Sequence, residues 1–488
     1  MNMTALPLPA ETDADWLIFV KAECDTCVLA EPAIKSVVDA GHKLRLVVQD
    51  DPEFLSSLGS QGDEELRASY SWDIEITPTL IALKGGVEVS RVEGWDRAAW
   101  RDCFGQPDLG DDLPGFRPGC GSKSREPGVH EHLAALYGVS EFESRQLSIG
   151  KWDDEIEVCF EHGWTDGLPV VPPTDARIIR MLQGTRREPQ EVIGKVPPNL
   201  SPITVEKVAI NAVMAGCKPE YLPVVLAALE AALEPIFTMH GLLCTTCFSS
   251  PIIVVNGPIT KKIGMNWGMN VLGQGNRANA TIGRALQLII RNVGGGVPGD
   301  LDRSTLGGPG KYTFCFAEDE YTDEDWEPLS VSRGFSKGTD TVTLFQGDGI
   351  QGFIDQRSRT PEEITKSLAM SLLAVGHPKL AEFTNAMLVL SPEHHGIYKD
   401  AGWDRARITD ELHAAMLRPG SELVQGAQGV GEGIVESRAG EMVRKFWPEG
   451  LLIVRAGGQA GLYSAICAGW TGGRFRDESQ AVTKEIIS

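Results

Sequence analysis

Cys24 and Cys27 are the two residues of this chain whose spacing most directly suggests chemistry. Cysteines two residues apart can alternate between a dithiol and a disulfide, because the second sulfur can resolve a mixed disulfide formed by the first. The apolar run at 16–20 predicts a buried strand before the pair, and the apolar spacing of 28–40 predicts a helix after it. A thiol at a helix N-terminus is favoured as thiolate by exposed N–H groups and the helix dipole. We therefore expect reversible thiol–disulfide chemistry at this turn.

The segments that follow predict a small domain of alternating strands and helices. Residues 43–49 alternate like a strand, and a helix is expected near 62–70. Residues 79–83 and 87–92 flank a Lys-Gly-Gly turn and have the pattern of a β-hairpin, and 95–104 predicts a short amphipathic helix. This β-α-β-α-β-β-α order implies a central sheet flanked by helices, which is an α/β fold.

With Pro32 inside the first helix, Ile76-Thr77-Pro78-Thr79-Leu80 before the hairpin and Gly94 after it, residues 15–105 resemble the thioredoxin family. The resemblance implies a thioredoxin-like fold in which Pro78 is the cis-proline that faces the two cysteines. The interior of the motif departs from the family, because Asp25-Thr26 stands where thioredoxins carry Gly-Pro. We expect the carboxylate of Asp25 to raise the pKa of Cys24 by like-charge repulsion, which would make the pair a modestly reactive dithiol donor. A redox-inactive adaptor is the alternative.

Bulk composition narrows the class of protein. The net charge of −22 argues against a nucleic-acid partner, which requires clustered Lys and Arg. The chain has no apolar run of membrane-spanning length, and its first fifteen residues lack the basic start and apolar core of a secretion signal. We therefore expect a cytoplasmic protein that does not bind a membrane, with its ten cysteines mostly reduced.

The chain is expected to divide into three parts: a thioredoxin-like domain over 1–105, a connecting region over 106–160, and a larger mixed α/β domain over 161–488. The Gly- and Pro-rich stretch 105–125 is interpreted as a linker or covering loop, and 130–160 is expected to be helical. Expected helices of the large domain are 204–216, 220–233, 278–292, 361–375 and 405–417, and expected strands are 252–256, 341–345, 385–390 and 451–455.

Three further cysteines of the large domain are candidates for catalysis. Cys217 lies between a predicted helix and the Pro219 that begins the next one, where a thiol can be activated; a buried apolar role is the alternative. Cys244 and Cys247 form a second Cys-x-x-C pair, with His240 four residues upstream. These three residues could bind zinc, with Cys217 completing a tetrahedral set. The pair could instead accept electrons from Cys24 and Cys27, or simply be packed in the core.

A loop rich in Gly and Asn at 264–284 is the candidate small-molecule site, because amide side chains and exposed backbone N–H groups suit polar ligands and arginine suits an anion. A tightly packed structural loop is the alternative. The candidate substrate-binding residues are Asn266, Asn270, Arg277, Asn279, Thr281, Arg284 and Lys311.

The glycine-rich segments 264–270, 273–284 and 456–461 resemble a bacterial family of large domains related to the small UGSC-motif (seleno)proteins. The resemblance implies reductive or thiol-based chemistry and a small thiol or selenol protein as partner. Cys120-Gly121-Ser122 matches three letters of that motif, but Lys123 breaks it. The acidic residues of 318–325 are expected to be solvated, with Glu318 worth attention because it follows Cys315 closely. His394-His395 is expected at the surface.

These observations lead to one main hypothesis and two alternatives. The main hypothesis is an enzyme in which the N-terminal dithiol reduces a cysteine centre, Cys217 or the pair Cys244 and Cys247, in a domain that binds a small, anionic molecule. The first alternative is a lyase or hydrolase that depends on a Cys/His metal site. The second is a non-catalytic, redox-regulated subunit of a selenoprotein-like reductase complex. A homo-oligomer is expected in each case.

Overall fold

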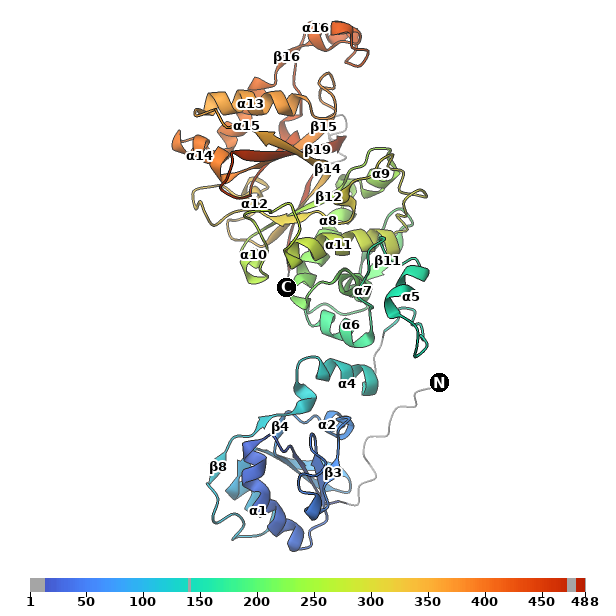
Figure 1. The fold of residues 1–488 in the computed structure, drawn as a ribbon, viewed down its shortest axis with the longest axis vertical. Helices are drawn as coiled ribbons and strands as arrows, with labels where there is room; N and C mark the ends of the chain where they lie inside the picture. Colours follow the sequence, from blue (N-terminus) through green and yellow to red (C-terminus); the bar gives the residue numbers. More distant parts are fainter. Residues whose placement is uncertain (1–13, 139–141, 472–479, 488) are drawn as a thin grey trace. The chain divides into compact units, whose positions relative to one another are not determined.

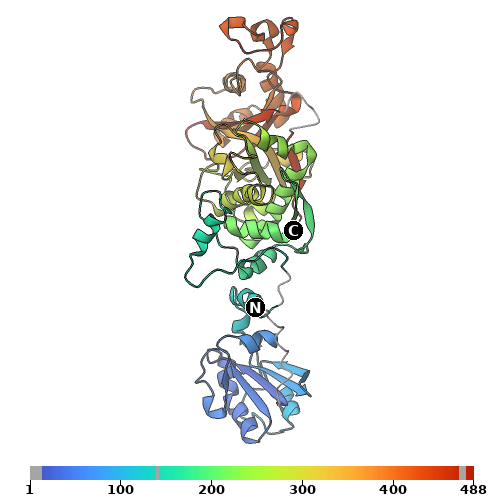
Figure 2. The same cartoon turned by 90° about the vertical axis from the view of Figure 1, so that its right-hand side faces the viewer.

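The structure is a computed structural model of the chain, and it describes residues 14–138, 142–471 and 480–487. These residues build a mixed α/β structure that clusters into two compact units (Figures 1 and 2). The first unit comprises the described residues up to Phe142 together with Thr174–Arg180. The second comprises Glu143–Pro173 and the described residues from Met181 onward. Helix α6 (Asp175–Leu182) spans a boundary between the two.

The first unit has nine strands and four helices before α6. The strands are β1 (Trp16–Val20), β2 (Leu44–Val48), β3 (Gln61–Gly62), β4 (Ile76–Thr77), β5 (Thr79–Lys84), β6 (Val87–Glu93), β7 (Trp95–Asp96), β8 (Phe116–Arg117) and β9 (Cys120–Gly121). The helices are α1 (Asp25–Asp39), α2 (Arg67–Ser71), α3 (Arg97–Phe104) and α4 (Val129–Tyr137).

The five-stranded sheet of the first unit has the order β3-β2-β1-β5-β6. Strand β1 runs parallel to β2 and antiparallel to β5, and β5 and β6 form the predicted hairpin. Because side chains alternate across a strand, Ile18 and Val20 of β1 pack with Ile34 of α1, whereas Leu17 and Phe19 pack on the opposite face. Strand β1 and helix α1 flank the turn that carries Cys24.

The second unit contains the remaining elements. Its helices are α5 (Glu155–Glu161), α7 (Val205–Ala215), α8 (Leu222–Leu233), α9 (Met239–Cys244), α10 (Ile259–Lys262), α11 (Arg277–Asn292), α12 (Leu329–Ser332), α13 (Pro361–Leu373), α14 (Pro392–Asp400), α15 (Arg405–Ala415) and α16 (Gly420–Leu423). Its strands are β10 (Val192–Val196), β11 (Ser201–Thr204), β12 (Ser250–Asn256), β13 (Cys315–Ala317), β14 (Thr341–Ile354), β15 (Thr384–Leu390), β16 (Arg418–Pro419), β17 (Met442–Val443), β18 (Leu451–Arg455), β19 (Tyr463–Thr471) and β20 (Val482–Glu485).

The main sheet of the second unit has the order β13-β12-β14-β19-β15-β18, and β20 pairs with β14. Helices α7, α8 and α11 share a core with β12 and β14, whereas α13, α14 and α15 share another with β15 and β18 (Figure 1). Strand β15 is buried on both faces: Leu388 packs toward the second of these cores, and Met387 and Val389 pack toward a third cluster that includes Phe316. Continuously apolar strands of this kind are what the sequence predicts for 252–256 and 385–390.

Several predictions about the second unit and about the segment 130–160 before it are wrong. The helix expected over 130–160 is instead the two helices α4 and α5, and described residues 142–154 between them are not helical. His394 and His395 begin α14 and are buried, not at the surface. Asp319 is also buried, not solvated, and pairs with Arg455 at 2.7 Å. Glu318, which its closeness to Cys315 in the sequence set apart from the other acidic residues, is buried and pairs with Arg405 at 3.0 Å. These ion pairs compensate the loss of hydration.

Within the described ranges, none of the helices taken singly has the length and apolar character needed to span a membrane. Two segments joined by a 75° bend, Pro219–Leu233 and Pro235–Cys244, pass that test only when combined. Most of α8, which lies in the first segment, is buried in the core of the second unit.

Candidate thiol site

Cys24 and Cys27 lie where β1 leads into α1. Cys24 is the N-cap residue of α1, with extended backbone, and Cys27 lies in the first turn. The Cys24 Sγ is 3.3 Å from the carbonyl oxygen of Thr77, and the backbone N–H of Lys21 donates to Cys27 Sγ at 3.5 Å. Both side chains are fully buried. The sequence therefore places the pair correctly at a strand-to-helix turn but does not reveal that it is covered.

The surroundings of the two sulfurs favour opposite charge states. The pKa of Cys24 falls to about 4, chiefly because the Cys27 thiol donates to it, with further help from the Cys120 thiol and the N–H groups of Cys27 and Thr26. Burial opposes this effect. The pKa of Cys27 rises well above that of an ordinary thiol, because burial and its bond to the Cys24 thiolate both favour the protonated form. Cys24 is therefore the more acidic thiol of the pair, and Cys27 the one that keeps its proton.

The predicted influence of Asp25 is wrong, because the pKa of Cys24 is lowered rather than raised. The Asp25 side chain is largely exposed, and its carboxylate lies 3.5 Å from the guanidinium of Arg117. A charge that points into solvent and has a cation beside it repels a buried thiolate weakly, since water screens it. Hydrogen bonds made directly to the sulfur therefore dominate.

The Thr77–Pro78 peptide bond is cis, as the sequence predicts. Thr77 belongs to β4, which pairs antiparallel with β9 so that Thr77 lies opposite Cys120. Its carbonyl oxygen also lies 3.3 Å from Cys24 Sγ. Thr77 thus contacts both the dithiol and a segment around Cys120, which follows Thr77 by more than forty positions in the chain.

That segment, residues 116–124, covers the dithiol and is called the covering strap below. Its backbone pairs with β7 through β8 and with β4 through β9. The hydroxyl of Thr26 donates to the carbonyl oxygen of Pro118 at 2.7 Å, and the ammonium of Lys21 donates to that of Gly121 at 2.7 Å. Of the two interpretations of 105–125, the covering loop is confirmed for this part.

The covering strap is anchored at its far end as well. Gln49 donates to the hydroxyl of Ser122 at 2.7 Å, and the hydroxyl of Ser124 donates to the carbonyl oxygen of Ile74 at 2.9 Å. At its centre, a Cβ on Gly119 would lie 2.5 Å from the carbonyl oxygen of Thr77. Only glycine allows so close an approach, so this position is needed for the strap to lie against β4.

Cys120 is a third thiol at this site, and sequence reasoning missed it. Its side chain hydrogen bonds with Cys24, and its pKa rises because of burial and because the Cys24 thiolate favours a proton on its neighbour. It is partly exposed, whereas Cys24 and Cys27 are not. The available signal was a cysteine in the Gly- and Pro-rich stretch directly after the predicted domain.

The cysteines of the second unit have different surroundings. Cys217 is buried and donates to the carbonyl oxygen of Thr281 at 3.4 Å, and burial raises its pKa to about 12. Cys244 and Cys247 are exposed free thiols, and the side chain of His240 is exposed as well. In the part of the chain that the structure describes, no three His, Cys, Asp or Glu side chains gather in a way that could hold a metal ion. The predicted zinc set is therefore not formed.

The Gly/Asn loop satisfies most of its own polar groups. Asn279 is buried and bonds both the N–H and the carbonyl oxygen of Asn266, while Asn270 donates to the carbonyl oxygen of Gln274. Thr281 donates to the carbonyl oxygen of Arg277, whose guanidinium donates to that of Gly216. These bonds are what a structural loop requires.

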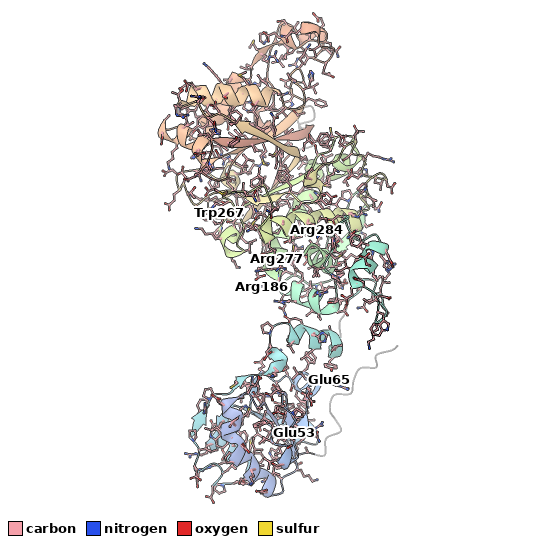
Figure 3. All side chains as sticks on the ribbon, in the orientation of Figure 1. Glu53, Glu65, Arg186, Trp267, Arg277 and Arg284 are labelled. Carbon is pink, nitrogen blue, oxygen red and sulfur yellow. The ribbon has the colours of Figure 1, made fainter. Side chains whose placement is uncertain are left out.

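The two remaining cations of the predicted substrate site are also paired. Arg284, on α11 like Arg277 (Figure 3), holds Asp166 through two bonds of 2.8 and 2.7 Å. The ammonium of Lys311 donates to Asp302 at 2.6 Å. Each positive charge therefore has a carboxylate partner within the same unit, and neither cation is available to an anion without breaking that pair.

One pocket of about 480 Å³ lies beside this loop. It is lined by Asn270 and Gly273 of the loop, by apolar side chains such as Val389, and by the hydroxyls of Ser391 and Ser464. The Nδ1 atom of buried His394 lies 2.8 Å from the Ser464 hydroxyl, and its Nε2 atom lies 3.1 Å from the carbonyl oxygen of Asp355. Among the predicted substrate residues, Asn270 is thus placed at a cavity.

Since a carbonyl oxygen can only accept, His394 carries its proton on Nε2, and burial lowers its pKa, so the ring is neutral. The Ser464 hydroxyl then donates to Nδ1. This wall of the pocket is uncharged and fully hydrogen-bonded.

Comparison of the chain with protein-family models, curated proteins and solved structures gives no match in any of the three.

Proposed function

We propose that the first unit is a thioredoxin-like domain and that the protein is a thiol–disulfide oxidoreductase. Three features support this proposal: the strand order of the sheet, the Cys-x-x-Cys pair at the start of α1, and the cis Thr77–Pro78 bond, whose Thr77 carbonyl oxygen lies beside Cys24 Sγ.

The observation that carries the proposal is the unequal pair of sulfurs. The pKa of Cys24, lowered to about 4, favours its thiolate at neutral pH, and the raised pKa of Cys27 favours its protonated form. In the reaction, the Cys24 thiolate attacks one sulfur of a substrate disulfide, forms a mixed disulfide and releases a thiolate that takes up a proton. Cys27 then loses its proton, attacks Cys24 Sγ and expels the second substrate thiol. The substrate gains two electrons, and Cys24 and Cys27 become a disulfide.

The acceptor within the chain is proposed to be the pair Cys244 and Cys247. Thiol–disulfide exchange requires direct attack on a sulfur, so an exposed pair is a better acceptor than a buried thiol. Both residues are exposed, whereas Cys217 lies inside the core of the second unit with a raised pKa. The small molecule of the second unit is proposed to occupy the pocket beside Asn270.

The experiment replaces the resolving thiol, so that a disulfide formed at Cys24 can no longer be passed to Cys27. In Cys27→Ser, we expect full-length protein treated with oxidised glutathione to form a disulfide at Cys24, identified by peptide mapping. Cys103→Ser is the matched control, because Cys103 lies in the same unit and hydrogen bonds with Ser90 instead. A Cys24 that stays free, while Cys244 becomes glutathionylated, would contradict the proposal.

A further inference from the structure

The covering strap places a sulfur where an incoming disulfide would have to pass. Cys24 and Cys27 are both fully buried, whereas Cys120 is partly exposed and hydrogen bonds with Cys24. The register of β4 and β9 fixes this arrangement, since Cys120 is paired with Thr77 and the Thr77 oxygen contacts Cys24 Sγ. The site is therefore a cluster of three thiols rather than a pair.

We propose that Cys120 is a third redox cysteine, which can displace Cys27 from the Cys24–Cys27 disulfide to form a Cys24–Cys120 disulfide. This disulfide, called the latch below, ties the covering strap to α1 and keeps it closed. This inference rests on the proposed thiol–disulfide function. It assigns Cys120 a role that neither a linker nor a simple cover would have, because a cover needs only the backbone pairing and the bonds of Thr26 and Lys21.

The exchange is balanced without an outside oxidant once the pair is oxidised. Cys120 loses its proton and attacks Cys24 Sγ, the Cys24–Cys27 bond breaks, and the Cys27 sulfur takes up the proton. One disulfide is lost and one is formed, so no net electrons are transferred. The reverse attack by Cys27 on Cys24 restores the original pair and frees Cys120.

Latching would close the site chemically as well as sterically. In the latched form Cys24 has no thiolate, and the only other free sulfur of the cluster is Cys27, which is buried and holds its proton. The strap is then joined to α1 by a covalent bond in addition to its hydrogen bonds. An oxidised protein would thus be protected from further exchange until Cys27 reverses the latch.

The test maps disulfides in full-length protein equilibrated with oxidised and reduced glutathione. In Cys27→Ser, glutathione first attaches to Cys24; Cys120 then attacks Cys24 Sγ and releases reduced glutathione. We expect a Cys24–Cys120 peptide to replace the glutathione adduct. A stable adduct at Cys24, with Cys120 still alkylated by iodoacetamide, would overturn the latch.

Two companion proteins separate this inference from the function on which it rests. Cys120→Ser should form the Cys24–Cys27 disulfide and no other within the first unit, and Cys103→Ser should behave as wild type. If Cys120→Ser and wild type both form Cys24–Cys27, but Cys27→Ser never joins Cys24 to Cys120, the latch fails and the oxidoreductase stands. If neither forms Cys24–Cys27, the proposed function itself fails.

Hydrogen exchange gives a readout that does not depend on Cys27→Ser folding normally. In oxidised wild type, the amides of Cys120 and Gly121 should exchange more slowly than in oxidised Cys120→Ser, because the latch removes strap opening. Equal exchange in the two oxidised proteins would overturn the proposal.

Discussion

Cys24 and Cys217 are both buried thiols beside a helix or turn that begins immediately after them, yet their pKa values differ by many units. The pKa of Cys24 is about 4, and that of Cys217 is about 12. Both sulfurs lie near a carbonyl oxygen, that of Thr77 at 3.3 Å for Cys24 and that of Thr281 at 3.4 Å for Cys217. Only Cys24 also receives hydrogen bonds from two thiols and two backbone N–H groups. Burial alone therefore raises the pKa of a thiol and keeps it protonated, whereas burial beside several hydrogen-bond donors lowers the pKa and favours the thiolate.

The largest expected effect on the difference between Cys24 and Cys217 comes from removing the main hydrogen-bond donor to Cys24. In Cys27→Ala, we expect the pKa of Cys24 to rise toward that of an ordinary thiol, about 8.5, because the Cys27 thiol is the largest cause of its depression. The pKa is measured from the pH dependence of thiolate absorbance near 240 nm, with Cys103→Ala as control. An unchanged midpoint would assign the depression to the backbone instead.

The second prediction concerns Cys217, the thiol that stays protonated. With a pKa of about 12, about one Cys217 in ten thousand is ionised at pH 8, so iodoacetamide should not modify it in the folded protein. Cys244 and Cys247, which are exposed, should react within the same sample and serve as internal controls. Peptide mapping before and after denaturation in urea checks this; rapid native labelling of Cys217 would remove the contrast with Cys24.

The third prediction is a pH dependence of stability. The folded-state pKa of Cys24 is lowered to about 4, so between pH 4 and about 8.5 the unfolded reduced chain binds a proton that the folded one does not. Stability of the first unit should therefore rise with pH across this window, by at most about 1.4 kcal/mol per pH unit, and this contribution is lost as pH falls through 4.

Urea unfolding at pH 5 and pH 7 checks this slope, with Cys24→Ala as the reference because it lacks the titrating group. Hydrogen exchange of the backbone amides of β1 and α1 at each urea concentration reports the first unit specifically. Cys27, whose pKa is raised, works in the opposite direction and only above the unfolded pKa, so it does not affect this interval. Identical slopes in wild type and Cys24→Ala would show that Cys24 is not ionised in the folded state.

The smallest expected effect concerns the cover rather than the sulfur. Thr26→Ala removes the bond to Pro118, which is worth about 1 kcal/mol, so the strap should open about five times more often. Alkylation of Cys24 should accelerate to the same extent. Ser71→Ala is a matched control, because it removes a hydroxyl-to-carbonyl bond elsewhere in the unit. Equal rates in the two variants would mean that the strap does not limit access.

Local patterns were sufficient for much of the secondary structure. The strand at 16–20 and the hairpin of β5 and β6 lie where their apolar patterns predict. The long helices α7, α8, α11, α13 and α15 lie within two residues of the predicted bounds at every end. Strands β19 and β20 were missed, because glycine and polar residues interrupt their apolar pattern and their stability comes from pairing with β14. Such pairing is non-local and leaves no periodic signal.

The predicted substrate residues show a second limit. Asn279, Arg284 and Lys311 were chosen because their side chains can bind ligands, but in the structure they bind Asn266, Asp166 and Asp302. A sequence gives the hydrogen-bonding capacity of a side chain. It does not say whether that capacity is already used by a partner far along the chain.

By itself the sequence determined that Cys24 and Cys27 lie at a strand-to-helix turn, because apolar periodicity and the Cys-x-x-Cys spacing are local properties. Only the tertiary structure decided that the pair is buried, that Cys120 joins it and that Asp25 faces away. The charge of a sulfur depends on the donors within a few ångströms of it, and here the main donor, Cys27, is local, whereas Cys120 adds a second from a strap nearly a hundred residues later.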